Sequence, residues 1–117
     1  MRLACLFPAV LSGLCLAAPA AAATTYEGRD QMLLHCAGLL LEVSERLTRA
    51  GHMTKENYAD SQALALLYLA ELPGSERDRV NALKSFRKRV LDPLSFNELS
   101  DELDRKVDGC KKLIDVG

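Results

Sequence analysis

The sequence is organised around a segment that reads Ala63-Leu64-Ala65-Leu66-Leu67-Tyr68-Leu69-Ala70. These eight residues contain no charged or strongly polar side chain. A helix that is apolar on nearly every side is typically enclosed by other helices. We therefore expect residues 63–70 to form the buried centre of the fold, covered by the rest of the chain.

Start and stop signals flank this segment on both sides. Thr54 is a good N-cap residue, and Pro73-Gly74 breaks a helix by removing a backbone donor and allowing a positive φ. These signals predict a helix over residues 54–72. Upstream, apolar residues at steps of three and four predict another helix over residues 31–50, which ends at Gly51.

Two further helices are predicted downstream. The first spans residues 75–91 and ends there because Asp92, the next residue, precedes Pro93 and is pushed out of helical geometry. Ser95 and Glu98 then have the spacing of a capping box, which starts a fourth amphipathic helix. Gly109 lies inside its pattern and could end it early.

These patterns predict an all-α, up-down-up-down four-helix bundle, a single small domain with one disulfide bond. In such a bundle, the start of the first helix and the end of the fourth lie at the same end. Cys36 and Cys110 occupy those two positions, each within an apolar stripe. We therefore expect them to pair, with two unpaired buried thiols as the alternative.

Residues 1–23 have the features of a secretory signal peptide. Arg2 precedes an apolar run over residues 3–18, and small residues follow that fit a cleavage site. Cleavage would remove Cys5 and Cys15 and leave residues 24–117 as a periplasmic or secreted helical domain without an integral membrane span. An oxidising compartment agrees with a disulfide in that domain.

Charge is nearly balanced, with a formal net charge of −1, which argues against nucleic acid as a partner. Its distribution is uneven, since residues 75–91 are basic and residues 92–108 are acidic. One interpretation is that these two helices are neighbours and attract each other, and that pairs such as Asp101 with Arg105 and Glu102 with Lys106 support the last helix internally. The other is that Arg77, Lys84 and Lys88 form an exposed cationic stripe for an acidic partner or an anionic surface.

The sequence predicts no catalytic residues, no cofactor and no metal site. Charged residues fall mainly on the outward phases of the helices, and no nucleophile, base and orienting group stand at a recognisable spacing. His35 and Cys36 are adjacent, so their side chains point about 100° apart on a helix, which is unsuitable for a shared metal ion. We expect His35 on the solvated face and no enzymatic activity.

The sequence carries more apolar surface than a bundle needs. The apolar arc over residues 31–50 spans roughly 220°, whereas an ordinary amphipathic helix has an arc a little over 100°. The excess could be enclosed by packing or by the C-terminal tail, or it could form a self-association face or a partner-binding groove. Candidate residues for such a surface are Leu34, Leu41, Leu64, Leu67, Tyr68 and Leu72.

The leading functional hypothesis is a periplasmic, non-catalytic protein-binding module that masks or escorts another exported protein. An immunity-type inhibitor of a secreted toxin is one specific form of it. A dimeric periplasmic chaperone or stress protein, whose apolar face is covered by a second copy, is the main alternative. A small secreted helical enzyme is the third.

Overall fold

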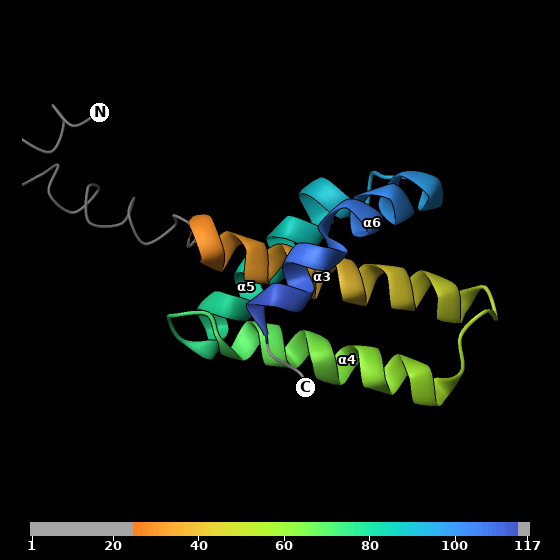
Figure 1. The fold of residues 1–117 in the computed structure, drawn as a ribbon, viewed down its shortest axis with the longest axis horizontal. Helices are drawn as coiled ribbons and strands as arrows, with labels where there is room; N and C mark the ends of the chain where they lie inside the picture. The colour runs from red at the N-terminus through yellow and green to blue at the C-terminus, as the bar shows by residue number, and fades with distance from the viewer. Residues whose placement is uncertain (1–24, 115–117) are drawn as a thin grey trace, which may run out of the picture.

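The computed structural model describes residues 25–114, and within this range it contains helices and no strand. The α-helices are α3 (Gly28–Arg49), α4 (Lys55–Ala70), α5 (Glu76–Phe86) and α6 (Phe96–Leu113), and a π-helical turn, η1 (Arg87–Leu91), extends α5 (Figure 1). The all-α fold is therefore confirmed. None of the described helices has both the length and the apolar character needed to span a membrane. The predicted signal peptide, with Cys5 and Cys15, lies outside the described residues.

The predicted starts of α4, α5 and α6 are present as hydrogen-bonded caps, whereas α3 begins at Gly28, before the predicted residue 31, and has no side-chain cap. The Thr54 hydroxyl accepts from the Asn57 backbone N–H, and both Ser75 and Ser95 take part in capping boxes, the latter with Glu98. Gly74 has a φ of 96°, which a side chain would strain, so the turn between α4 and α5 depends on it. These interactions are local, and this explains why short sequence motifs predict them correctly.

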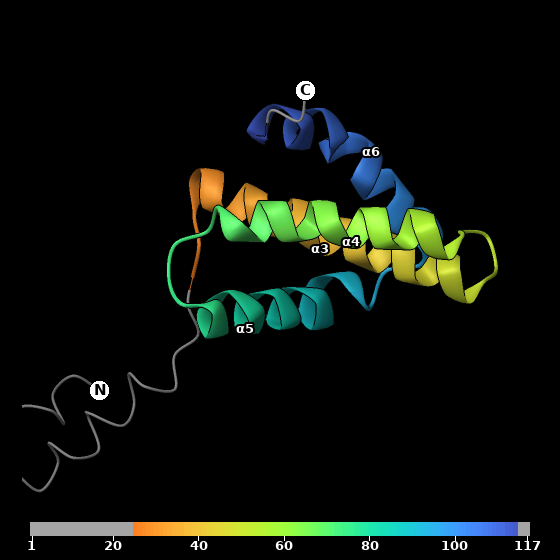
Figure 2. The ribbon, with the colours of Figure 1, turned by 90° about the horizontal axis from the view of Figure 1, so that it is seen from below.

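Successive helices alternate in direction, as predicted, but α3 is the central helix rather than α4. The other three helices pack on different sides of α3, with α5 and α6 on opposite sides (Figure 2). Leu33 and Leu39 of α3 are fully buried. The prediction that the 63–70 segment is the buried centre is wrong, because only Ala65, Tyr68 and Leu69 of that segment are buried. Helix α4 has one covered face and one open face because it packs mainly on α3.

The Cys36–Cys110 disulfide is confirmed, and it joins α3 to α6. Both sulfurs are buried in the core. Gly109 does not end the last helix, since α6 continues to Leu113, and Cys110 therefore lies within regular helix. The two bonded cysteines are 74 residues apart in the sequence.

Two helical glycines give a test of how closely the helices pack. A Cβ atom on Gly38 would lie 2.7 Å from two ring carbons of buried Phe86, whereas one on Gly109 would meet only the mobile methyl end of Met32. We expect Gly38→Ala to lower the free energy of unfolding by about 1–3 kcal/mol through overpacking. Gly109→Ala should leave it unchanged or raise it by up to about 1 kcal/mol, because alanine favours helix.

Urea denaturation followed by circular dichroism would measure both variants. Equal stability of Gly38→Ala and wild type would contradict the close packing of α3 against Phe86.

Candidate functional site

The six apolar residues predicted as a binding surface do not form one surface. Leu34, Tyr68 and Leu72 are buried in the core, so they cannot contact a partner in this conformation. Leu41 and Leu64 are partly buried against the core, and only Leu67 is exposed, at 52% of its surface. The predicted set therefore mixes core residues with one residue of the open face of α4.

The open face of α4 carries an apolar stripe of five exposed residues that the structure brings together. Leu66 is 63% exposed, and with Leu67 it is among the few large apolar side chains of the described chain that remain open to solvent. Alanines at spacings of three and four extend the line on both sides. We call the α4 stripe the set Ala59, Ala63, Leu66, Leu67 and Ala70.

Sequence reasoning missed Leu66 for a physical reason. Residues 63–70 are apolar on every side, so the 3.6-residue period gives no direction to the helix. The outward side was set by Ala65, Tyr68 and Leu69, which pack against the core. A weak sequence signal for the open face was the line of alanines, whose small side chains allow another element to approach closely.

A shallow groove adjoins the stripe between the end of α4 and the start of α5. Its volume is about 190 Å³, and it is open to solvent. Leu66 and Ala70 form one wall and Val80 of α5 the other, with Glu76 and Arg79 beside them. The groove continues the apolar surface of α4 onto α5, where Val80 is partly exposed.

Tyr68, one of the predicted binding residues, has a structural role instead, because it links α4 to α6. Its hydroxyl donates a hydrogen bond of 2.8 Å to the Cys110 carbonyl oxygen in the last turns of α6, and burial raises the pKa of its phenol. We expect Tyr68→Phe to lower the free energy of unfolding by about 1 kcal/mol, since a buried acceptor loses its donor. Tyr58→Phe on the same helix is the matched control, because its hydroxyl meets only exposed Gln62. Equal urea midpoints for the two variants would contradict this role.

The predicted cationic stripe is exposed as expected. Arg77, Lys84 and Lys88 are open to solvent, and within residues 25–114 none of them forms an ion pair. The alternative interpretation is correct only in part: Glu102 pairs with Lys106 within α6, but α5 and α6 lie on different sides of α3, and no ion pair joins them within residues 25–114. Among the described residues, Arg87 is the basic residue of the α5–η1 segment that forms ion pairs, and its partners lie on α3.

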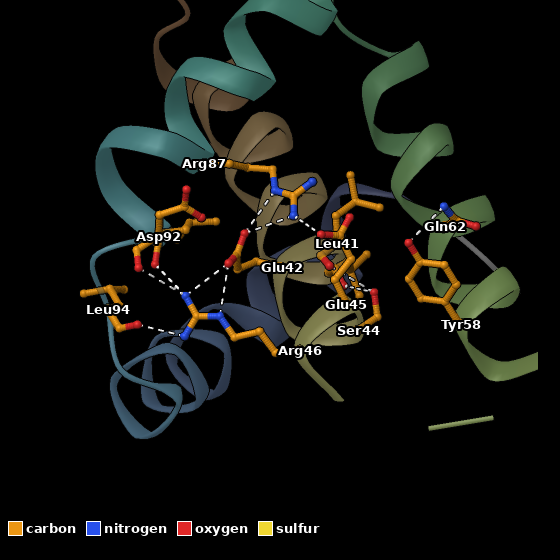
Figure 3. Close-up of polar contacts among 12 residues, drawn as sticks. Leu41, Glu42, Ser44, Glu45, Arg46, Tyr58, Gln62, Arg87, Asp92 and Leu94 are labelled. Carbon is orange, nitrogen blue, oxygen red and sulfur yellow. Dashed lines mark hydrogen bonds and ion pairs between the residues drawn. The ribbon is translucent and has the colours of Figure 1, made fainter. Parts of the chain in front are cut away.

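That pairing forms a buried charged cluster, which sequence reasoning also missed. Glu42 of α3 is 4% exposed, although charged residues were expected mainly on the outward phases of the helices. Its carboxylate accepts hydrogen bonds of 3.0–3.1 Å from Arg87 of η1 and of 3.0 Å from Arg46 (Figure 3). Arg87 also donates to Glu45 at 2.6 Å. We call these four residues the Glu42 cluster.

The Glu42 cluster fixes the end of η1 against α3. Arg46 donates to the carbonyl oxygens of Leu91 and Leu94, at 3.0 and 2.8 Å, so it satisfies backbone acceptors that follow the π-helical turn. Burial alone would raise the pKa of Glu42, but the hydrogen bonds and charge of Arg87 and Arg46 outweigh it and hold that pKa below its ordinary value. The Glu42 carboxylate thus already accepts hydrogen bonds from both arginines, which indicates a structural role.

A second concave surface of about 410 Å³ lies between the first half of α3 and α5. His35 and Phe86 stack in its wall, with ring centroids 4.2 Å apart and planes 7° apart. The prediction that His35 lies on the solvated face is wrong, since it is half-buried. Burial, aided by Lys106 and opposed by Glu102, lowers the pKa of His35.

The described part of the chain contains no group of three or more residues able to hold a metal ion. Its fold and surface define a small disulfide-linked helical domain with one open apolar helix face. No protein-family model matches the sequence, and comparison with curated proteins and with solved structures finds no match.

Proposed function

We propose that this chain is a non-catalytic protein-binding module that masks or escorts another exported protein through the α4 stripe. The observation that carries the proposal is the exposure of the consecutive residues Leu66 and Leu67 on the open face of a helix whose other face is packed in the core. Exposed apolar surface next to a groove is the usual basis of helix-in-groove and anchor-residue recognition.

The chemistry of the buried polar groups supports a binding role over a catalytic one. Glu42, the buried carboxylate, is already bonded to two arginines. His35 is stacked on the apolar ring of Phe86, and the charged groups that influence its pKa are Lys106 and Glu102 of α6. Among the residues that the structure describes, neither is hydrogen-bonded to a nucleophile and an orienting partner of the kind that acid–base or covalent catalysis requires.

An exported location is part of the proposal. The Cys36–Cys110 bond supports it, since structural disulfides persist in oxidising compartments. The leader-like residues 1–23 support it from the sequence.

The test is a pull-down from a periplasmic extract of the source cells with three versions of the domain. Wild type should retain one protein in a stoichiometric amount. Leu66→Lys/Leu67→Lys should lose it, because two charges then occupy the apolar contact. Phe96→Lys, at an exposed position on α6, should retain it as the matched control.

Equal capture by all three versions would place the contact elsewhere, and no capture by wild type would overturn the proposal. Masking of a secreted enzyme, as an immunity-type inhibitor would do, predicts that the captured protein loses its activity when the wild-type domain is added.

A further inference from the structure

The concave surface between the first half of α3 and α5 shares no residue with the α4 stripe, and the proposed function leaves it unused. We propose that it is a binding site for a small organic acid, in which a carboxylate is attached to an apolar body such as an aromatic ring. This inference goes beyond the proposed function, because it concerns a different surface and a small molecule. We call this surface the α3–α5 pocket.

The α3–α5 pocket has the size of a small-molecule site. Its volume is about 410 Å³, and such sites range from about 300 to 1,000 Å³. Helix α3 supplies Gln31, Leu34 and His35, which share one face of that helix at steps of three and four. The other wall comes from α5 and η1, which run in broadly the same direction as α3 (Figure 2). The pocket is therefore built mainly on regular helices, which hold its side chains at fixed positions.

The inner wall of the pocket is apolar. Leu34, Ala82 and Phe86 line it and are buried, and Val90 beside them is 48% exposed. Phe86 lies this close to α3 because Gly38 has no side chain, since a Cβ atom there would lie 2.7 Å from two carbons of the Phe86 ring. An apolar ligand body placed against this wall would remove the exposed carbons of the wall from water, which favours binding.

The outer wall is polar and carries one formal charge. Arg89 of η1 is exposed, and within residues 25–114 it forms no ion pair. No carboxylate stands among the described residues that line the pocket, so none of them neutralises Arg89. A guanidinium presents two parallel N–H groups that fit the two oxygens of a carboxylate. The pocket is therefore complementary to an organic acid in charge and in hydrogen-bonding geometry.

Three neutral side chains in the same wall can add hydrogen bonds to the ligand. The amide of Gln31, the imidazole of His35 and the hydroxyl of Ser85 line the pocket. Within the described part of the chain, none of these three groups takes part in a side-chain hydrogen bond. Each of them therefore has a donor that remains available to a ligand.

The charges around His35 favour an anion over a cation. Burial lowers the pKa of His35, Lys106 of α6 lowers it further, and Glu102 of the same helix acts in the opposite direction. Arg89 is the charged residue among the described residues that line the pocket. A cationic ligand would add a further positive charge here, whereas a bound carboxylate would favour the charged imidazolium and raise the pKa of His35. The pocket should therefore distinguish an acid from an amine of the same shape.

Titration of the purified, isotope-labelled protein with phenylacetate, followed by two-dimensional NMR, tests the site. We expect saturable shifts of the backbone amides that line the pocket, with a dissociation constant of about 1 mM or below. Phenethyl alcohol and phenethylamine carry the same ring with a neutral or a cationic group, and they should bind at least about 10-fold more weakly. No saturable shift with phenylacetate up to about 20 mM, or equal binding of the alcohol, would overturn the proposal.

Two arginine variants separate the pocket from a general attraction of anions to the basic α5–η1 segment. Arg89→Gln should raise the dissociation constant for phenylacetate at least about 10-fold, because it removes the charge that binds the carboxylate. Arg77→Gln is the matched control, since Arg77 is exposed on α5 and does not line the pocket, and its dissociation constant should equal that of wild type. Circular dichroism and thermal midpoints check that both variants fold. Equal weakening in the two variants would overturn the site.

The ring signals of His35 give a second readout in the wild-type protein. At saturating phenylacetate the pKa of His35 should rise, because the bound carboxylate stabilises the imidazolium. Sodium chloride at the same ionic strength is the reference. The ring signals of exposed His52, in the turn after α3, should follow the same titration curve under both conditions. An unchanged or lowered pKa of His35 would overturn the proposal.

Discussion

Replacing Cys36 and Cys110 together with alanine is expected to lower the free energy of unfolding by about 4 kcal/mol. The bond closes a loop over a sequence separation of 74 residues, and its loss restores conformational freedom to the unfolded chain in the chain-entropy model. Both residues are buried, so alanine avoids placing new hydroxyl groups in the core. The loss is a large part of the total stability of a domain of this size.

Urea denaturation with and without reductant is the measurement. Wild type in reductant should unfold near the midpoint of the double-alanine variant, while the variant itself should not respond to reductant. Two free thiols per molecule in the unreduced native protein would contradict the disulfide.

Replacing Glu42 with glutamine is expected to cost about 3 kcal/mol, the second large effect. The carboxylate is nearly fully buried, and its removal leaves Arg46 and Arg87 without their shared counter-charge in a partly buried setting. We take the lower end of the range for broken buried pairs because both arginines retain some contact with water. The turn η1 should loosen from α3 as a consequence.

The matched control is Glu102→Gln on α6. Glu102 also pairs with two basic residues, but these pairs are more exposed, so its loss should cost less than about 1 kcal/mol. Glu42→Leu combined with Arg87→Leu should recover part of the loss, because it removes the unpaired charge. Similar stabilities of the Glu42 and Glu102 variants would show that the Glu42 cluster contributes no more to the free energy of unfolding than the more exposed pairs of Glu102.

The contribution of Glu42 also depends on pH, with a defined sign. Its pKa in the folded protein lies below the ordinary value of 4.5, so its stabilising effect is fully present above that value. The effect is lost as the pH falls through the lower, folded pKa. The stability difference between wild type and Glu42→Gln should therefore be constant from pH 7 to about pH 5 and shrink toward pH 2. Urea titrations at several pH values would measure it, and a constant difference down to pH 2 would contradict the lowered pKa.

Signals within a few residues of one another were sufficient to predict the helices. The caps at Thr54, Ser75 and Ser95 and the break at Pro73-Gly74 operate within one turn of backbone, so the sequence contains all the partners that matter. The Cys36–Cys110 pairing was also accessible, because the alternation of helix directions places those two positions at the same end.

Side-chain exposure could not be predicted in the same way. The apolar run over residues 63–70 gave the correct helix but no direction, so Leu66 was overlooked and Tyr68 was assigned to the surface. The candidate binding face became visible only when the buried side of α4 was known.

The sequence by itself determined the helices, the capped starts of α4, α5 and α6 and the disulfide, since each depends on local hydrogen bonds or on the order of the elements. Only the tertiary structure decided that α3 is central, that Glu42 is buried and that Leu66 is exposed. The physical reason is that burial depends on partners distant in sequence. Arg87, which covers Glu42, lies 45 residues away in the sequence, and no periodic pattern near Glu42 indicates that Arg87 will contact it.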